Sequence, residues 1–328
     1  MELMIPDLER LGNDGCTRIW LARYGRPRRD RYLRDLGRFR EWLGKEPKIL
    51  VLNARRRGPV RANRALTDYY NYLTEEEGKA PTSANQYITR LRGYFTANGV
   101  YLGKFHRKTD VQATYEGPKA SSLSRQDVAN MVKSRNEARD KFVIAFLAQT
   151  GQRIGILTAI TRKKMTEKAV RGHGIVRVPS TFPDRRGQNV NALGREYTFI
   201  VGRDTMKLLP LLDKLSWDKE GRLKLSMRQM GRIVDKAAEA IGIQNKPPTK
   251  IGNSWSDVHP NTLRKYWRKC MFDAKADTRA VLHMMGSNLP SILRGCELTD
   301  KELLEAYEKA ESKLGLVDPP RTEDAQTE

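Results

Sequence analysis

Apolar side chains recur at helical spacing through the first hundred residues, and this pattern constrains the fold more than any other feature of the chain. The segment RDRYLRDLGRFREWLG places its apolar residues on one stripe and its arginines on the opposite face. The segments RANRALTDYYNYLTEEEG and TSANQYITRLRGYFTANG repeat this pattern, and the second of them stops at Gly99. The aromatic residues on these stripes are predicted to form a core rather than base-stacking platforms. Residues 1–112 are therefore predicted to be a small helical domain.

A break in the apolar pattern separates this region from the rest of the chain. Residues 113–123 lack periodicity and contain Gly, Pro and Ser, which predicts a linker. Beyond them, Ser124 and Asp127 resemble a capping box at the start of a new helix. The strongly apolar segment ARDKFVIAFLAQTG is predicted to be a helix that stops at Gly151. A second domain therefore begins at residue 124.

Two segments of this second domain alternate in β-branched and aromatic residues. GIVRVPS and EYTFIV are predicted to be strands, joined by a long polar connection. The other apolar segments have helical spacing, and the last of them, TDKELLEAYEKAESKL, opens with a capping box. The domain is predicted to span residues 124–314, followed by a disordered tail at 315–328. The predicted fold class is mainly α with a small β-sheet, divided between two lobes.

The charge balance of the chain favours a polyanionic partner. It has 61 Lys and Arg against 39 Asp and Glu, a formal net charge of +22. The excess extends over both predicted domains, and nucleic acid is the first candidate. No apolar run reaches about 18 residues and no signal peptide opens the chain, which predicts a cytoplasmic, DNA-associated protein without membrane contact. The three cysteines and four histidines lack metal-ligand spacing, so no metal site is predicted.

Three short motifs follow one another in the second domain. TGQR occupies residues 150–153, NTLR residues 261–264 and MMGS residues 284–287. With the helical first domain and the linker, this series resembles the tyrosine recombinases, the family of phage and archaeal integrases and Xer-type enzymes. The resemblance extends from about Arg28 to Leu314. It implies a two-lobed architecture of a helical core-binding domain and an α+β catalytic-type domain, and it implies no metal or cofactor.

The resemblance implies that Arg153 and Arg264 correspond to the two catalytic arginines of the family. Attack of a tyrosine on a DNA phosphodiester builds negative charge on the non-bridging oxygens. Forked guanidinium donors stabilise that charge most when it is greatest. The same reaction needs a lysine or histidine to protonate the leaving oxygen and a group that helps to deprotonate the tyrosine.

These proton-handling positions differ from the family pattern. The resemblance places Asn261 and Ser287 at the two histidine positions and Cys296 at the tyrosine position. No lysine occurs between Lys168 and Lys207, so the strand connection holds only arginines as cations. Arginine stays protonated and is a poor proton donor. The charge-stabilising groups are kept while the acid, base and nucleophile are not, which predicts a degenerate catalytic site.

Two residues remain candidates for the nucleophile. Tyr307 lies on the apolar stripe of the last predicted helix, where packing against a core or a partner helix is favoured over catalysis. Cys296 requires a thiolate of lowered pKa, and the neighbouring Arg294 offers only mild help. A small residue filling a vacated position is the favoured interpretation of Cys296.

The favoured function is binding of double-stranded DNA by a catalytically impaired member of this family, which clamps the duplex between two basic lobes. The alternatives are an active integrase or site-specific recombinase that cleaves and rejoins DNA through a covalent 3′-phosphotyrosine at Tyr307, and an RNA-associated protein without recombinase ancestry. The last helix is expected to dock on its own domain or on a neighbouring protomer, and the second case predicts a homo-oligomer on DNA. The predicted DNA contacts are Arg90, Arg92, Arg153, Arg185, Arg186, Arg195, Arg264 and Lys265.

Overall fold

The chain folds into two compact units. The structure, a computed structural model, describes residues 5–103, 123–244, 258–288 and 298–316. Unit 1 comprises Met1–Lys119 and unit 2 comprises Ala120–Glu328. Most of the predicted linker and of the predicted tail lies outside the described residues.

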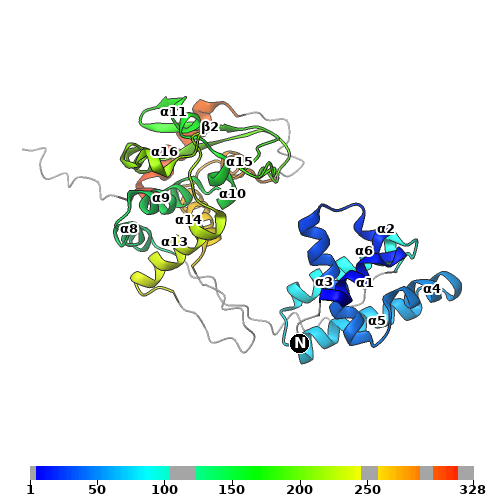
Figure 1. Ribbon diagram of the computed structural model, residues 1–328. Helices are drawn as coiled ribbons and strands as arrows, with labels where there is room; N and C mark the ends of the chain where they lie inside the picture. Colours follow the sequence, from blue (N-terminus) through cyan, green and yellow to red (C-terminus); the bar gives the residue numbers. More distant parts are fainter. Residues whose placement is uncertain (1–4, 104–122, 245–257, 289–297, 317–328) are drawn as a thin grey trace, which may run out of the picture. The chain divides into compact units, whose positions relative to one another are not determined.

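Unit 1 is helical throughout its described part (Figure 1). Its elements are α1 (Ile5–Asn13), α2 (Gly15–Leu21), α3 (Arg26–Leu43), α4 (Pro47–Arg57), α5 (Val60–Asn71), the π-helical turn η1 (Tyr72–Glu76) and α6 (Pro81–Ala97). The apolar pattern predicts α3, α5 and α6, which are the three longest. Helices α1, α2 and α4 are additions to the predicted elements.

Most aromatic residues on the predicted stripes of unit 1 are buried in its core, as predicted. Trp20 and Tyr94 are buried edge to face with ring centroids 5.5 Å apart, and Phe39 packs on Tyr69 in the same way at 5.1 Å. Such pairs add stabilisation to the burial of the rings. These rings are therefore not available for stacking on bases.

Unit 2 combines helices with one small sheet. Its elements are α8 (Arg125–Lys133), α9 (Ala138–Thr150), α10 (Ile154–Ala159), α11 (Arg162–Thr166), β1 (Ala169–Val170), β2 (His173–Val178), β3 (Tyr197–Val201), α12 (Arg203–Leu208), the 3₁₀ turns η2 (Leu209–Leu211) and η3 (Lys214–Ser216), α13 (Met227–Ala240), α14 (Pro260–Asp273), α15 (Thr278–Met284) and α16 (Asp300–Leu314). The strand order is β1-β2-β3, antiparallel throughout. The predicted fold class, mainly α with a small sheet, is confirmed; β1, α11 and α12 are additions to the predicted elements.

Helix α9 is the centre of unit 2. Every residue from 142 to 150 is buried, and α8, α13 and α14 pack around the helix (Figure 1). It ends at Gly151, whose φ of +62° is in the left-handed region. A Cβ at this position would lie 2.5 Å from a ring carbon of Trp267, so both the backbone and the packing require glycine.

The polar connection between β2 and β3 is ordered by side-chain to backbone hydrogen bonds. Asn191 donates to the carbonyls of Pro179 at 2.7 Å and Arg195 at 2.8 Å, while Asn189 accepts from the amide of Phe182 at 2.9 Å. Asn side chains of this kind replace the ladder bonds that a loop lacks. The connection therefore holds a defined path that returns the chain to β3.

Helix α16 packs on its own unit. Thr299 and Glu302 form the predicted capping box at its start. The predicted stripe is buried against α14, α15 and β3, and it consists of Leu303, Leu304, Tyr307, Ala310 and Leu314. Of the two docking surfaces expected for this helix, the structure shows the first. Association of protomers through α16 stays a prediction.

The polar side of α16 is tied to the start of the sheet by acidic side chains. Glu308 pairs with Arg171 at 3.0 Å, and Glu311 pairs with Arg203 at 3.4 Å. Nε2 of the buried His173 lies 2.8 Å from Glu311 as well. These contacts fix α16 to unit 2 along one edge of its buried stripe, while Lys301, Glu305 and Lys309 remain exposed.

Candidate phosphate-binding site

The segments that follow α9 and α15 lie close together, and arginines bind carbonyl groups in both. Arg264, in the second turn of α14, donates from Nη1 to the carbonyl of Gly151 at 2.6 Å. Its Nη2 donates to the carbonyl of Met285 at 2.8 Å, just beyond α15. The TGQR, NTLR and MMGS segments are therefore brought together around one guanidinium.

Arg264 is a buried cation without a counter-ion. Its exposed fraction is 9 %, and no carboxylate pairs with it within the described ranges. Burial and the nearby charge of Arg153 lower the pKa of Arg264 to about 10. A buried charge is costly unless an opposite charge compensates it. This position therefore favours an anion more than a free guanidinium would.

Arg153 lies beside Arg264 but faces solvent. It is the N-cap residue of α10, and its Nη1 donates to the carbonyl of Gly286 at 3.3 Å. The two guanidiniums thus bind the adjacent carbonyls of Met285 and Gly286. Each guanidinium has five N–H donors, so Arg153 keeps several of them for a ligand.

A third arginine reaches the same turn from the β2–β3 connection. Arg195 is exposed, and its Nη2 donates to the carbonyl of Ser287 at 3.4 Å. The hydroxyl of Ser287 accepts from Arg264 at 3.4 Å. The structure thus brings together four of the predicted site residues: Arg153, Arg195, Arg264 and Ser287.

Asn261, at the other predicted histidine position, is exposed on the first turn of α14. Its backbone amide donates to Nδ1 of His259 at 3.1 Å, and the amide of Thr262 donates to the same nitrogen at 3.3 Å. His259 is therefore the N-cap of the helix. Cys296 lies outside the described residues.

Tyr307 is remote from solvent. It is fully buried, its hydroxyl donates to the carbonyl of Gln149 at 2.8 Å, and its ring meets His173 edge to face. Burial and the nearby carboxylate of Glu311 raise the pKa of Tyr307 well above its usual value. Its contacts are those of a core residue.

Three further cations that the sequence predicts as DNA contacts differ in whether they bind groups of unit 2 itself. Arg185 pairs with Asp218 at 3.0 Å and donates to the carbonyl of Leu223. Arg186 is exposed, and so is Lys265 on α14. Arg185 is therefore committed internally, while the other two remain accessible.

The two predicted contacts in unit 1 have internal partners. Arg90 pairs with the buried Asp35 at 2.6 Å. Arg92 donates to the carbonyls of Leu102 at 3.0 Å and Gly103 at 2.7 Å. Both guanidiniums hold elements of unit 1 together, which the spacing of the residues does not reveal.

Other arginines of unit 1 are exposed and unpaired. The α4–α5 arginines, as we name them, make no ion pair within the described part of the chain; they are Arg56, Arg57, Arg61 and Arg64. No Asp or Glu occurs between Glu46 and Asp68, so nothing near them in sequence offsets their charge. The sequence signal for these residues is the run RRRGPVRANR, which lies off the apolar stripes.

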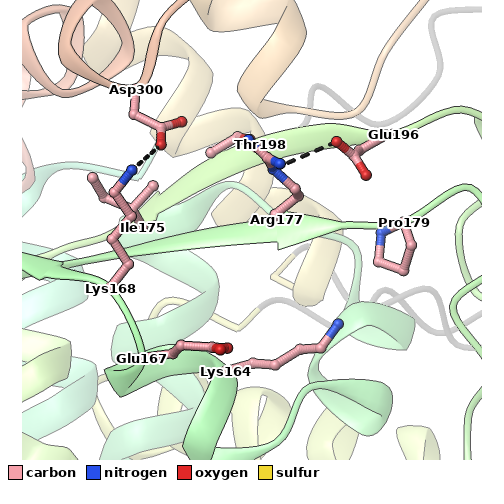
Figure 2. Close-up of a pocket in the computed structure, with 9 residues that line it drawn as sticks. All are labelled: Lys164, Glu167, Lys168, Ile175, Arg177, Pro179, Glu196, Thr198 and Asp300. Atoms are coloured by element: carbon pink, nitrogen blue, oxygen red, sulfur yellow. Dashed lines mark hydrogen bonds and ion pairs between the residues drawn. The ribbon is translucent and has the colours of Figure 1, made fainter.

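A second basic region, on the face of the sheet, is largely neutralised. Figure 2 shows a shallow pocket in which Lys168 points at Asp300 and Arg177 points at Glu196. Lys164 lies 4.9 Å from the ring centroid of Phe182. Because its charges are mostly paired, this pocket is a weaker anion site than the arginine cluster.

The scaffold beneath the arginines contains two residues that the sequence does not single out. The hydroxyl of Tyr197 donates to Oε1 of Gln152 at 2.9 Å, and Nε2 of Gln152 donates to the carbonyl of Met284 at 2.6 Å. Gly286 packs on the Tyr197 ring: a Cβ there would lie 2.6 Å from Cζ. Gln152 lies within the TGQR motif, but its contact with Tyr197 is formed only by the tertiary fold.

Two absences apply to the described part of the chain. No group of three His, Cys, Asp or Glu side chains in it is placed to hold a metal ion. None of its helices combines the length and the apolar character needed to cross a membrane.

Comparisons with known proteins relate the chain to one relative by sequence and to solved structures by fold. No family model matches the chain. The tyrosine recombinase XerC of Thermodesulfovibrio yellowstonii is 23 % identical over 261 residues, which cover 73 % of this chain and 79 % of the relative. The Tn1549 transposon integrase in complex with circular intermediate DNA matches with a TM-score of 0.55 and 12 % identity, over 90 % of this chain and 99 % of that one.

A second solved structure has the same fold. A lambda integrase dimer bound to a COC′ core site matches with a TM-score of 0.52 and 15 % identity, over 90 % of this chain and 98 % of that one. At these identities the two structures show the fold alone. The match to XerC is a similarity in sequence. The chain is thus similar in sequence to a tyrosine recombinase and shares its fold with two integrases.

Proposed function

We propose that the protein binds double-stranded DNA and that the cluster of Arg153, Arg195 and Arg264 contacts a backbone phosphate. The observation that carries the proposal is the buried Arg264, which has no carboxylate partner among the described residues and lies beside a second cation. A phosphodiester supplies the missing charge and oxygens that match forked donors. The DNA complexes of the integrases that share the fold support the choice of duplex.

Unit 1 supplies a second basic surface in the α4–α5 arginines. Since both units carry unpaired cations and are joined by one chain, each unit raises the local concentration of the other at the same duplex. This supports the proposal of a clamp formed by two basic lobes. Phosphate contacts of this kind position a protein on DNA without reading sequence.

We further propose that catalysis is impaired, because no described group near the arginines is suited to proton transfer. His283 accepts from the amide of Thr198 at 3.0 Å through Nε2, and burial lowers its pKa. His259 is occupied by the amides of its own helix. The hydroxyl of Tyr197 donates to Gln152, and burial raises its pKa to about 12.

Salt dependence tests the clamp. Each neutralised phosphate contributes about −0.9 to the slope of log K against log[salt], so Arg61→Ala/Arg64→Ala should reduce the magnitude of the slope by about 1–2. Lys48→Ala/Lys79→Ala removes the same charge from cations that already pair with Asp14 and Glu77, and should leave the slope nearly unchanged. Fluorescence anisotropy on a labelled duplex measures both. Equal changes in the two variants, or tighter binding of structured RNA than of duplex, contradict the proposal.

The alternative function, DNA cleavage through a phosphotyrosine, is tested on a nicked duplex that traps covalent intermediates. The wild-type protein is expected to form no adduct, because the arginines stabilise charge without a donor for the leaving oxygen and Tyr307 is buried. Denaturing electrophoresis detects any adduct. An adduct that disappears in Tyr307→Phe would establish the alternative; an adduct lost only in Cys296→Ser would instead identify the thiolate as nucleophile.

A further inference from the structure

The hydroxyl of Tyr197 belongs to a buried hydrogen-bond network beneath the arginines. The residue begins β3, its exposed fraction is 3 %, and it donates to Oε1 of Gln152 at 2.9 Å. Gln152 is itself buried, and its Nε2 donates to the carbonyls of Met284 at 2.6 Å and Thr150 at 3.3 Å. One amide thus connects β3, the end of α9 and the end of α15.

The turn after α15 supplies the acceptors that hold the arginines. The carbonyl of Met285 accepts from Arg264, and the carbonyl of Gly286 accepts from Arg153. The residue before them, Met284, is the one that Gln152 binds. A shift of this turn would therefore move both guanidiniums together.

The ring of Tyr197 packs against Gly286 of the same turn and restrains it. Gly286 has a φ of +56° and lies so close that a Cβ would be 2.6 Å from Cζ and 2.9 Å from Cε1 of the ring. Burial raises the pKa of Tyr197, and the charges of Arg153 and Arg264 act on it in the opposite direction, which is consistent with all three groups sharing one neighbourhood.

We infer that Tyr197 is a positioning residue: through Gln152 and the turn at Gly286 it holds Arg153 and Arg264 in the geometry that receives a phosphate. The inference rests on the proposed function and deepens it. Binding groups require support from surrounding packing and hydrogen bonds, since a displacement of about 1 Å leaves a site present but weak. Phenylalanine would keep the ring under Gly286 and remove only the donor to Gln152. The orphaned Oε1 would then release the amide from its fixed orientation.

The test uses Tyr197→Phe in the full chain, with Tyr266→Phe as matched control. Tyr266 is also buried in unit 2, and its hydroxyl donates to the carbonyl of Lys313 at 2.8 Å, so the same atom and the same kind of bond are lost. Tyr197→Phe should weaken binding to a labelled duplex by about tenfold, because an unsatisfied buried acceptor costs roughly 1–3 kcal/mol. Tyr266→Phe should change it by less than about twofold. Thermal unfolding of both variants separates loss of affinity from loss of stability.

Coupling to the arginines distinguishes positioning from general destabilisation. In an Arg264→Ala background, Tyr197→Phe should weaken binding by much less than in the wild type, because the group that it positions is gone. Unchanged affinity in Tyr197→Phe, or a loss of the same size in both backgrounds, overturns the inference.

A measurement on the DNA-free protein distinguishes a failure of this inference from a failure of the proposed function. The ¹⁵N resonances of the Arg264 guanidinium, followed in the free protein, should shift in Tyr197→Phe and stay in place in Tyr266→Phe. If they shift as expected while Arg264→Ala leaves duplex binding intact, the positioning of the guanidinium is correct and DNA binding by this cluster is wrong. If they do not shift, the inference is wrong whatever the affinity.

Discussion

Replacing both Arg153 and Arg264 by alanine is expected to weaken duplex binding by on the order of a hundredfold or more. A hydrogen bond to a charged group contributes roughly 1.5–3 kcal/mol, so two such contacts amount to roughly 3–6 kcal/mol. About 1.4 kcal/mol corresponds to a factor of ten in affinity. Because the two guanidiniums bind neighbouring carbonyls, their effects should be coupled rather than additive. Anisotropy titrations of the single and double variants at one fixed salt concentration measure both quantities.

A matched control variant loses the same net charge, so a difference between the two variants reflects the arginine cluster itself. Lys269→Ala/Arg279→Ala also removes two positive charges from unit 2, but the exposed Lys269 pairs with Asp273 and the half-buried Arg279 pairs with Asp277. Its binding should stay within about threefold of wild type, since exposed pairs contribute little and are screened by salt. Arg264→Ala also leaves the carbonyls of Gly151 and Met285 without their donor, so thermal unfolding must accompany the titrations. Equal losses in the two double variants would mean that overall charge, not this cluster, binds the duplex.

Deleting α16 is expected to abolish the cooperative unfolding of unit 2. The helix buries four large side chains, namely those of Leu303, Leu304, Tyr307 and Leu314. Burial of one such side chain is worth about 1.5–3 kcal/mol, so the loss is roughly 6–12 kcal/mol, which is comparable to the total stability of about 5–15 kcal/mol of a typical domain. Differential scanning calorimetry of the full and shortened chains would measure the transition.

A point substitution provides a milder version of the same experiment. Tyr307→Ala removes a buried ring and its hydrogen bond to Gln149, and should lower the free energy of unfolding of unit 2 by about 3–5 kcal/mol. Lys309→Ala, on the exposed side of the same helix, should leave it nearly unchanged. A shortened chain whose unit 2 still unfolds cooperatively would show that α16 is not part of its core. That outcome would favour docking of the helix on a neighbouring protomer.

Much of the helical framework could be predicted because burial of one face leaves a periodic mark on the sequence. The stripes of α3, α5 and α6 are long enough to show that period, as is the stripe of α16. Capping boxes at Ser124 and Thr299 also depend only on residues three positions apart. The shorter helices α1, α2 and α4 were not predicted.

The sequence by itself predicted the two central groups of the candidate site, because the motifs TGQR and NTLR point to Arg153 and Arg264. Only the tertiary structure decided which arginines are free for a ligand. Arg90 is taken by Asp35, 55 residues away, whereas Arg61 and Arg64 of the α4–α5 arginines have no such partner in the described part of the chain. The physical reason is that a guanidinium binds whatever oxygen the fold brings within about 3 Å, and that oxygen can come from anywhere along the chain. The same holds for Tyr197, whose bond to Gln152 joins residues 45 positions apart.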